Sequence, residues 1–356
     1  MSPRPLALRA ASALVDRLGQ TPAQLVRAAF GEPPRSDRGI ALDLPTHAIL
    51  RLMALTGRGR VHGLEPAHAR AVARRDGALA ELRRHPEVGE RELEVAGLPA
   101  RVYTPPASDP GPRPLLVWLH GGGFVLGGLA THRGFCSQLA ARSGCVVVAV
   151  DYRKAPEHPF PAAVDDALTS VRWVRAHAET LGGRAEALAV GGDSAGGNLS
   201  AVVCQQLRAA DEPQPALQVL VYPTTDARHP FPSTRQFAEG FLLEADLIHW
   251  FGEHYFQDPN DHVDPRASPL LADPTALAGL APALIRTAGF DPLRDEGEAY
   301  ADALRAAGVA VDLRCYERLI HNYVVMGRIS RANRAAIDDL GDELRLFFAT
   351  GALAGA

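Results

Sequence analysis

The fold is decided by the stretch Gly191-Gly192-Asp193-Ser194-Ala195-Gly196-Gly197-Asn198, which lies between an apolar run (188–191) and a helical pattern (195–210). A Gly-x-Ser-x-Gly pattern at a strand-to-helix junction is typical of a nucleophile elbow, a turn so tight that the positions flanking the serine must be small. The alternative is an ordinary glycine-rich turn. Because a serine hydroxyl is a poor nucleophile at neutral pH, a catalytic Ser194 requires a base and an orienting acid elsewhere in the chain.

Short β runs alternate with helical patterns from residue 91 onward. Three of the later runs are nearly all apolar, as expected for parallel strands that are covered on both faces. The sequence therefore predicts an α/β fold with a mostly parallel, doubly wound sheet. The predicted strands are 92–96, 100–103, 115–119, 145–150, 188–191, 217–222, 283–288 and 309–316, and the predicted helices are 162–181, 195–210, 296–307 and 331–348.

Two segments lie outside this alternation. Residues 1–90 have a helical pattern in 6–18, 23–30 and 66–84, and a loop rich in proline, glycine and arginine follows the second of these. Residues 226–261 are too long for a normal connection between strands and too aromatic for disorder, so we expect an insertion over a core made of 91–225 and 262–356. The aromatic residues of the insertion are Phe231, Phe237, Phe241, Trp250, Phe251, Tyr255 and Phe256.

The composition excludes several function classes. The net charge of -4 provides no basic field for a phosphate backbone, so no nucleic-acid partner is expected. Lys154 is the single lysine, and because Ala155 follows it and Asp151 lies three residues before it, neither a Walker A loop nor a Ser-x-x-Lys pair is present.

The remaining composition indicates where the protein works. The four cysteines form no Cys-x-x-Cys pair and indicate reduced, mostly buried thiols. Arginines interrupt the apolar residues near the N-terminus, so no signal peptide is predicted, and no stretch approaches the ~20 apolar residues of a membrane span. We expect a cytoplasmic protein without a membrane partner.

A second motif, His120-Gly121-Gly122-Gly123-Phe124, directly follows the predicted strand 115–119. Consecutive glycines let backbone N–H groups converge on one point, which is what a developing oxyanion requires. We expect Gly122 and Gly123 to donate, with the N–H of Ala195 as a third donor. A phosphate loop is the alternative, but no dinucleotide fingerprint accompanies the motif. His120 is interpreted as a structural residue rather than a base.

The acid and the base follow the serine in sequence. Asp291 stands just beyond the predicted strand 283–288, where catalytic groups of such sheets are found. Asp295 and Glu296 are rivals, but they open a helix, where carboxylates stabilise the N-terminal dipole. His321 is the one histidine after Asp291, and it follows the strand 309–316, so Ser194, Asp291 and His321 have the order of a hydrolase triad.

With these motifs the chain resembles the bacterial hormone-sensitive-lipase-like esterases, the family IV carboxylesterases of the α/β-hydrolase fold. The resemblance spans about residues 90 to 350 and includes Asp151-Tyr152-Arg153 and the run 155–162. It implies Ser194, Asp291 and His321 as the triad and Gly122, Gly123 and Ala195 as the oxyanion hole. We interpret the run 155–162 itself as a scaffold, with no direct catalytic role for Glu157 or His158.

The resemblance also implies a helical cap over the triad, made of residues 1–90 and 226–261, and short or medium acyl esters as substrates. Most aromatic residues of the insertion are expected in the cap's own core. Phe124 and Tyr323 are expected to line the substrate site, because each adjoins a catalytic motif. The resemblance is compatible with a homodimer and implies no metal or organic cofactor.

The chain departs from the family pattern at three positions. Family members usually have glycine and phenylalanine after the catalytic histidine, where this chain has Asn322 and Tyr323, and they usually have leucine where it has Lys154. Asparagine tolerates positive φ, so the loop can keep its shape. We expect these changes to affect substrate preference more than activity.

The function predicted from the sequence is hydrolysis of carboxylic esters through an acyl-enzyme intermediate. Amide or lactone hydrolysis by the same triad is a near alternative, because leaving-group preference depends on pocket geometry. A non-catalytic receptor resembling plant hormone receptors is a further alternative; those receptors typically lose the catalytic histidine, whereas this chain keeps His321.

Overall fold

The structure, a computed structural model, describes residues 21–57, 59–106 and 111–355. Their strands form one eight-stranded sheet in the order β1-β2-β4-β3-β5-β6-β7-β8. β1 and β2 pair antiparallel, β2 pairs antiparallel with β4, and all other neighbours are parallel, which confirms the predicted mostly parallel sheet. The strands are β1 (Gly89–Val95), β2 (Leu98–Thr104), β3 (Arg113–Leu119), β4 (Val146–Val150), β5 (Gly183–Asp193), β6 (Leu217–Val221), β7 (Ala283–Phe290) and β8 (Val311–Ile320).

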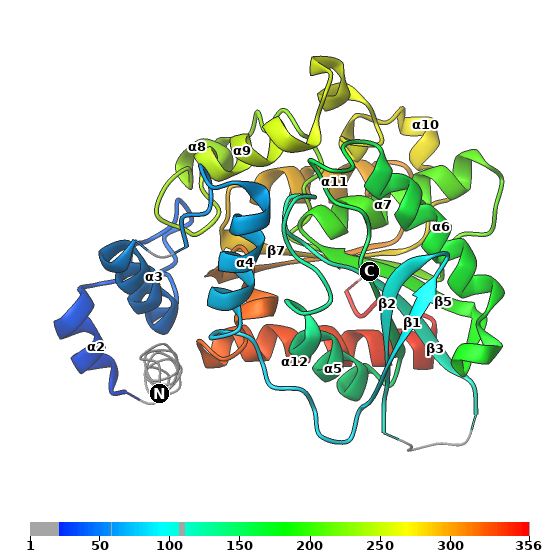
Figure 1. The fold of residues 1–356 in the computed structure, drawn as a ribbon, viewed down its shortest axis with the longest axis horizontal. Helices are drawn as coiled ribbons and strands as arrows, with labels where there is room; N and C mark the ends of the chain where they lie inside the picture. The colour runs from blue at the N-terminus through cyan, green and yellow to red at the C-terminus, as the bar shows by residue number, and fades with distance from the viewer. Residues whose placement is uncertain (1–20, 58, 107–110, 356) are drawn as a thin grey trace.

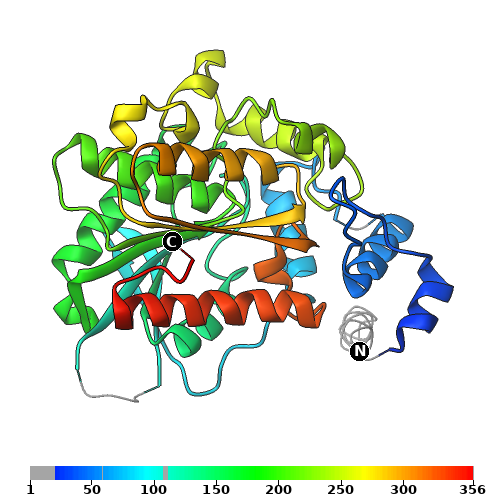
Figure 2. The ribbon, with the colours of Figure 1, turned by 180° about the vertical axis from the view of Figure 1, so that it is seen from behind.

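Helices cover both faces of the sheet (Figures 1 and 2). α5 (Arg133–Ser143) and α12 (Arg331–Thr350) pack on one face, and α6 (Ala162–Ala176), α7 (Ala195–Ala209) and α11 (Arg294–Ala306) pack on the other. The central strands β4, β6 and β7 are buried along their whole length, which explains why their sequences are apolar runs rather than alternating patterns.

The N-terminal part contains one helix that the sequence analysis missed. α2 (Ala23–Phe30) was predicted, but α3 (Leu44–Thr56) was not, and α4 (Pro66–Gly77) ends before the predicted residue 84. α3 begins with a recognisable signal, since Asp43 accepts a hydrogen bond from the N–H of Thr46 at its N-terminus. The predicted helix 6–18 lies outside the described residues.

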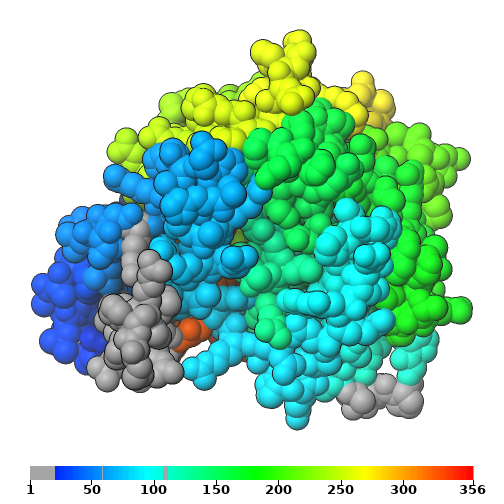
Figure 3. Space-filling model, viewed as in Figure 1, coloured from blue at the N-terminus to red at the C-terminus, as the bar shows by residue number. Residues whose placement is uncertain are grey.

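Residues 226–261 form a layer beyond α11 that includes α8 (Pro232–Gln236) and α9 (Ala245–Tyr255), with the 3-10 turn η2 (Pro259–Val263) at its end. Phe237 packs against Phe290 and belongs with Leu42 and Leu44 to one buried cluster, which joins this layer to the N-terminal helices. Figure 3 shows residues of these two segments adjoining on the surface. Within the described residues, no helix has the length and apolar character needed to cross a membrane.

Candidate active site

Ser194 lies at the turn between β5 and α7 in a conformation that few residues adopt, with φ 56° and ψ -118°. Its N–H donates to the carbonyl of Val221 on β6 at 2.8 Å. A Cβ on Gly196 would overlap the carbonyl oxygen of Leu119, and a Cβ on Gly192 would overlap the backbone of Gly196. The two glycines are therefore required by close backbone packing, and the strained serine is held in place by its surroundings.

The three residues predicted as a triad come together at the carboxyl edge of the sheet. Nε2 of His321 lies 2.9 Å from Oγ of Ser194, and Nδ1 lies 2.8 Å from Oδ2 of Asp291. The other carboxylate oxygen of Asp291 accepts the N–H of Leu293 at 2.9 Å. Asp291 follows β7, His321 follows β8, and all three side chains are buried. This is the geometry in which a carboxylate orients an imidazole toward a nucleophilic hydroxyl.

The glycine loop after β3 adopts backbone conformations that favour glycine. Gly122 and Gly123 have φ values of 125° and 58°, and the carbonyl of Gly122 accepts the N–H of Leu126 at 2.7 Å. Within the described residues, the N–H groups of Gly122 and Gly123 donate no hydrogen bond to the protein. The N–H of Ala195 opens α7, where the first N–H groups have no partner within the helix.

A buried ion pair ties this loop to the elbow. Oδ1 of Asp193 accepts the N–H of Gly121 at 3.0 Å and lies 3.0 Å from Nε2 of His132. Burial alone raises the pKa of Asp193, but the charge of His132 and its hydrogen bond outweigh burial and lower this pKa. For His132, burial lowers the pKa, but the charge of Asp193 raises it above its ordinary value.

His120 takes a position that fits a structural role. Its ring stacks on Tyr152 at 4.2 Å, Nδ1 lies 2.9 Å from the carbonyl of Gly121, and Nε2 lies 3.4 Å from Asp151. Lys154, one of the departures from the family pattern, binds the same Asp151 carboxylate at 2.5 Å. Burial lowers the pKa of His120, which favours the neutral ring.

Glu157 also serves the scaffold, through an arginine on α4. Arg70 binds both carboxylate oxygens of Glu157 and donates to the carbonyls of Val125 and Ala155 at 2.8 and 2.7 Å. Through these bonds the N-terminal helix α4 is joined to the end of the glycine loop.

A cavity of about 630 Å³ opens on Ser194. Phe124, which the sequence placed at the substrate site, lines this cavity, and its ring stacks on Tyr255 at 3.9 Å. Three of the seven aromatic residues of 226–261 line it as well, whereas Phe237, Phe241 and Trp250 pack among other apolar residues. The apolar and aromatic lining residues are Phe124, Ala195, Ala227, Leu243, Ala245, Ile248, Phe251, Tyr255, Phe256, Pro259, Ala267 and Leu293.

Tyr323 does not line this cavity, contrary to the expectation. Asn322 has φ 69°, the positive value anticipated for it, and the chain reverses there. The side chain of Tyr323 then enters the core, where its ring packs against Tyr222 at 5.0 Å and Tyr316 at 5.3 Å. Adjacency to His321 in sequence therefore does not bring Tyr323 to the cavity.

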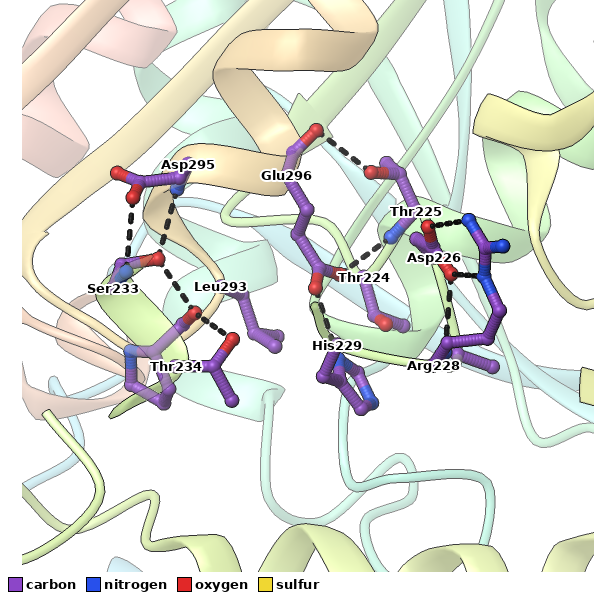
Figure 4. Close-up of polar contacts among 12 residues, drawn as sticks. Thr224, Thr225, Asp226, Arg228, His229, Ser233, Thr234, Leu293, Asp295 and Glu296 are labelled. Carbon is purple, nitrogen blue, oxygen red and sulfur yellow. Dashed lines mark hydrogen bonds and ion pairs between the residues drawn. The ribbon is translucent and has the colours of Figure 1, made fainter. Parts of the chain in front are cut away.

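Glu296 lies at a helix N-terminus, as expected, but its side chain also has more specific contacts. Its buried carboxylate accepts the N–H of Thr225 at 2.7 Å and lies 2.9 Å from Nδ1 of His229, which lines the cavity (Figure 4). Asp295 accepts the N–H of Ser233 instead. His229 and Glu296 are 67 positions apart in the sequence, so no local pattern could have revealed the pair.

In the part of the chain that the structure describes, no group of three or more histidine, cysteine or acidic side chains is arranged to hold a metal ion.

A family model described as the alpha/beta hydrolase fold matches residues 116–325, more than half of the chain. The carboxylic ester hydrolase LipN of Mycobacterium tuberculosis is 46% identical over 289 residues, which are 78% of this chain and 74% of that protein. The ethyl acetate hydrolase of Pseudomonas putida is also 46% identical, over 65% of this chain and 73% of that protein.

Solved structures agree with these matches. A thermostable esterase from Pseudomonas putida superposes with a TM-score of 0.81 at 38% identity, covering 86% of this chain and 97% of the other. An alpha/beta hydrolase enzyme from the metagenome of Lake Arreo superposes with a TM-score of 0.82 at 40% identity, covering 87% of this chain and 99% of the other.

Proposed function

Since the chain belongs to the alpha/beta hydrolase fold family, and within it to the hormone-sensitive-lipase-like carboxylesterases, we propose that it hydrolyses carboxylic esters of short to medium acyl length with Ser194 as nucleophile. One observation carries the proposal. The imidazole of His321 bridges Ser194 and Asp291 with bonds of 2.9 and 2.8 Å, and Ser194 lines a largely apolar cavity.

The proposed reaction has two steps. Nε2 of His321 takes the proton from Ser194 as Oγ attacks the ester carbonyl, and Asp291 holds the imidazole in the required tautomer and stabilises its charged form. The oxyanion accepts hydrogen bonds from Gly122, Gly123 and Ala195. His321 then protonates the leaving alcohol. In the second step it activates a water, which releases the acid and restores Ser194.

The cavity supports small substrates with apolar parts. Its volume of about 630 Å³ lies within the range of small-molecule sites, and aromatic and aliphatic side chains form much of its wall. Ethyl acetate, the substrate in the name of the Pseudomonas putida relative, has a two-carbon acyl group. We assign residues 226–261, together with the N-terminal helices, to a cap that covers the triad, because Phe251 and Tyr255 close the cavity from this side.

Initial rates on p-nitrophenyl esters with acyl chains from two to sixteen carbons test the proposal, with native protein and Ser194→Ala compared side by side. We expect turnover of the shorter esters, a decline toward the long ones, and a loss of about 10⁴-fold or more in the variant. Native protein that cleaves none of the esters, or a variant that retains native rates, would overturn it. Faster cleavage of a matched p-nitroanilide would reassign the enzyme as an amidase.

A further inference from the structure

A second imidazole-carboxylate pair faces the same cavity as Ser194. Nδ1 of His229 lies 2.9 Å from Oε2 of Glu296, a carboxylate on α11 that is fully buried. The N–H of Thr225 donates to the other carboxylate oxygen at 2.7 Å, and its hydroxyl donates to the Glu296 carbonyl at 2.8 Å (Figure 4). The loop that follows β6 is thereby fastened to α11, and the imidazole is held by its Nδ1 side.

The His229 side chain also borders the proposed substrate space. His229 lines the cavity together with Ser194, and its side chain remains 18% exposed. In the described residues, Nε2 makes no hydrogen bond to the protein. The backbone of His229 has φ 49°, a conformation that costs free energy for a residue with a side chain. A strained backbone at a residue that lines a cavity and keeps one ring nitrogen without a protein partner favours a ligand contact over a packing role.

We propose that His229 is a specificity-determining residue, which favours esters that carry a second oxygen acceptor, such as an ether or ketone oxygen, within reach of its Nε2–H. The inference rests on the proposed esterase function and names a substrate class for it. An otherwise apolar wall discriminates weakly between substrates, whereas a positioned donor discriminates strongly in favour of a partner that can accept its hydrogen bond.

The charge of His229 determines whether Nε2 donates. Burial lowers the pKa of His229, but the charge of Glu296, its hydrogen bond and the charge of Asp226 together raise this pKa above 6.5. Asp226 is itself paired with Arg228 at 2.7 Å. The other charged or titratable groups that line the cavity are His249, Glu253, Asp258 and His262. The imidazole is therefore a cation with an Nε2–H donor below its raised pKa, and it becomes a neutral acceptor above it.

Pairs of esters that differ by one oxygen for one methylene test the proposal. Ethyl 4-methoxybutanoate is compared with ethyl hexanoate for the acyl half, and 2-methoxyethyl acetate with butyl acetate for the alcohol half. The measured quantity is the ratio of kcat/KM for the oxygenated ester to kcat/KM for the plain ester. Titration of the triad affects both esters equally and cancels in this ratio, so the ratio reports on His229.

The double variant His229→Phe/Glu296→Gln removes the donor without leaving a buried charge unpaired. For at least one ester pair, we expect the kcat/KM ratio of the double variant at pH 6 to be roughly tenfold below that of native protein. The variant loses a hydrogen bond from a charged donor. His254→Phe is the matched control, because His254 lies on α9 with its Nδ1 on the Trp250 carbonyl and does not line the cavity. Its ratio should equal the native one.

Glu296→Gln alone keeps the imidazole and provides a second readout if the double variant does not fold. In native protein the ratio of kcat/KM for the oxygenated and plain esters should fall as the pH rises through the raised pKa of His229. In Glu296→Gln the charge that raises this pKa is removed, so the ratio should fall at a lower pH. A ratio that is independent of pH and equal in native protein and variants, for both ester pairs, overturns the inference and leaves the esterase proposal intact. Native protein that hydrolyses none of the four esters overturns both.

Discussion

A methyl group on Gly123 would overlap the aromatic ring of Phe251. The glycine belongs to the loop that we propose as the oxyanion hole, and the phenylalanine belongs to α9 in the proposed cap. The two segments are more than 120 residues apart, yet the ring lies directly against the backbone whose N–H must face the substrate. Packing of the cap on Gly123 thus explains why this position admits no side chain.

Gly123→Ala should lower kcat by about 10²-fold to 10³-fold. The added methyl group would overlap Phe251, and the φ of 58° is unfavourable for alanine, so the loop must shift. The shift would move the N–H of residue 123 away from the oxyanion. Gly39→Ala is the control, since Gly39 also has a positive φ, 74°, but a methyl group there would meet no neighbouring group within 4 Å. Kinetics with a short p-nitrophenyl ester compare the two. If Gly123→Ala and Gly39→Ala lose the same fraction of kcat, the strain of a positive φ alone lowers kcat and the overlap with Phe251 contributes nothing.

Asp291→Asn should leave the fold intact, because an amide oxygen still accepts the N–H of Leu293. It should lower kcat by about 10⁴-fold, since an amide that donates to Nδ1 selects the wrong tautomer of His321. Asp295→Asn serves as the comparison and should keep most of its activity, because Asp295 binds Ser233 and Arg294 rather than the histidine. If the two asparagine variants are equally active, Asp291 is not the acid.

The Asp193 and His132 pair predicts a specific dependence of stability on pH. The pKa of His132 is raised above 6.5 in the folded protein. Its contribution to the free energy of unfolding is therefore complete below pH 6.5 and is lost as the pH rises through the pKa of the folded state. The pKa of Asp193 is lowered below 3.8, so its contribution is present above pH 3.8 and is lost as the pH falls through the folded-state value.

Urea unfolding of native protein and His132→Gln from pH 4 to 10 measures this contribution. Breaking a buried pair by removing one partner costs about 3 to 5 kcal/mol in the free energy of unfolding. We expect a difference of this order near pH 5.5 that becomes smaller toward alkaline pH. A difference that instead grows with pH would contradict the assignment of a charged His132.

Arg70→Met should lower the free energy of unfolding by roughly 1 to 3 kcal/mol, because the carbonyls of Val125 and Ala155 lose their donor. Arg75→Met on the same helix removes an exposed pair with Asp76 and should cost less than about 1 kcal/mol. Thermal and urea unfolding compare the variants. Equal costs would show that Arg70 contributes only a surface ion pair.

The sequence predicts that the three proposed catalytic residues meet, because each follows a strand of a parallel sheet. Ser194 and Asp291 come directly after the largely buried strands β5 and β7, His321 comes directly after β8, and parallel strands place their carboxyl ends at one edge. Their meeting therefore follows from strand order and direction, which short motifs reveal without knowledge of side-chain packing.

The features that sequence reasoning missed depend on packing across the molecule. Tyr323 is next but one to His321, but the reversal at Asn322 sends its ring into the core. The pairing of His229 with Glu296 exists only because the loop after β6 lies against α11. A glutamate at a helix start has a sufficient local explanation, so nothing in the local sequence indicated the contact of Glu296 with His229.

Covalent labelling tests the central claim, that Ser194 is the nucleophile, most directly. Native protein is treated with a p-nitrophenyl alkylphosphonate, release of p-nitrophenol is counted, and the modified residue is located by mass spectrometry of peptides. The account predicts one equivalent released, the phosphonyl group on Ser194, and no reaction in Ser194→Ala or in protein unfolded by urea. A stoichiometric adduct on another residue, or the same release from Ser194→Ala, would contradict it.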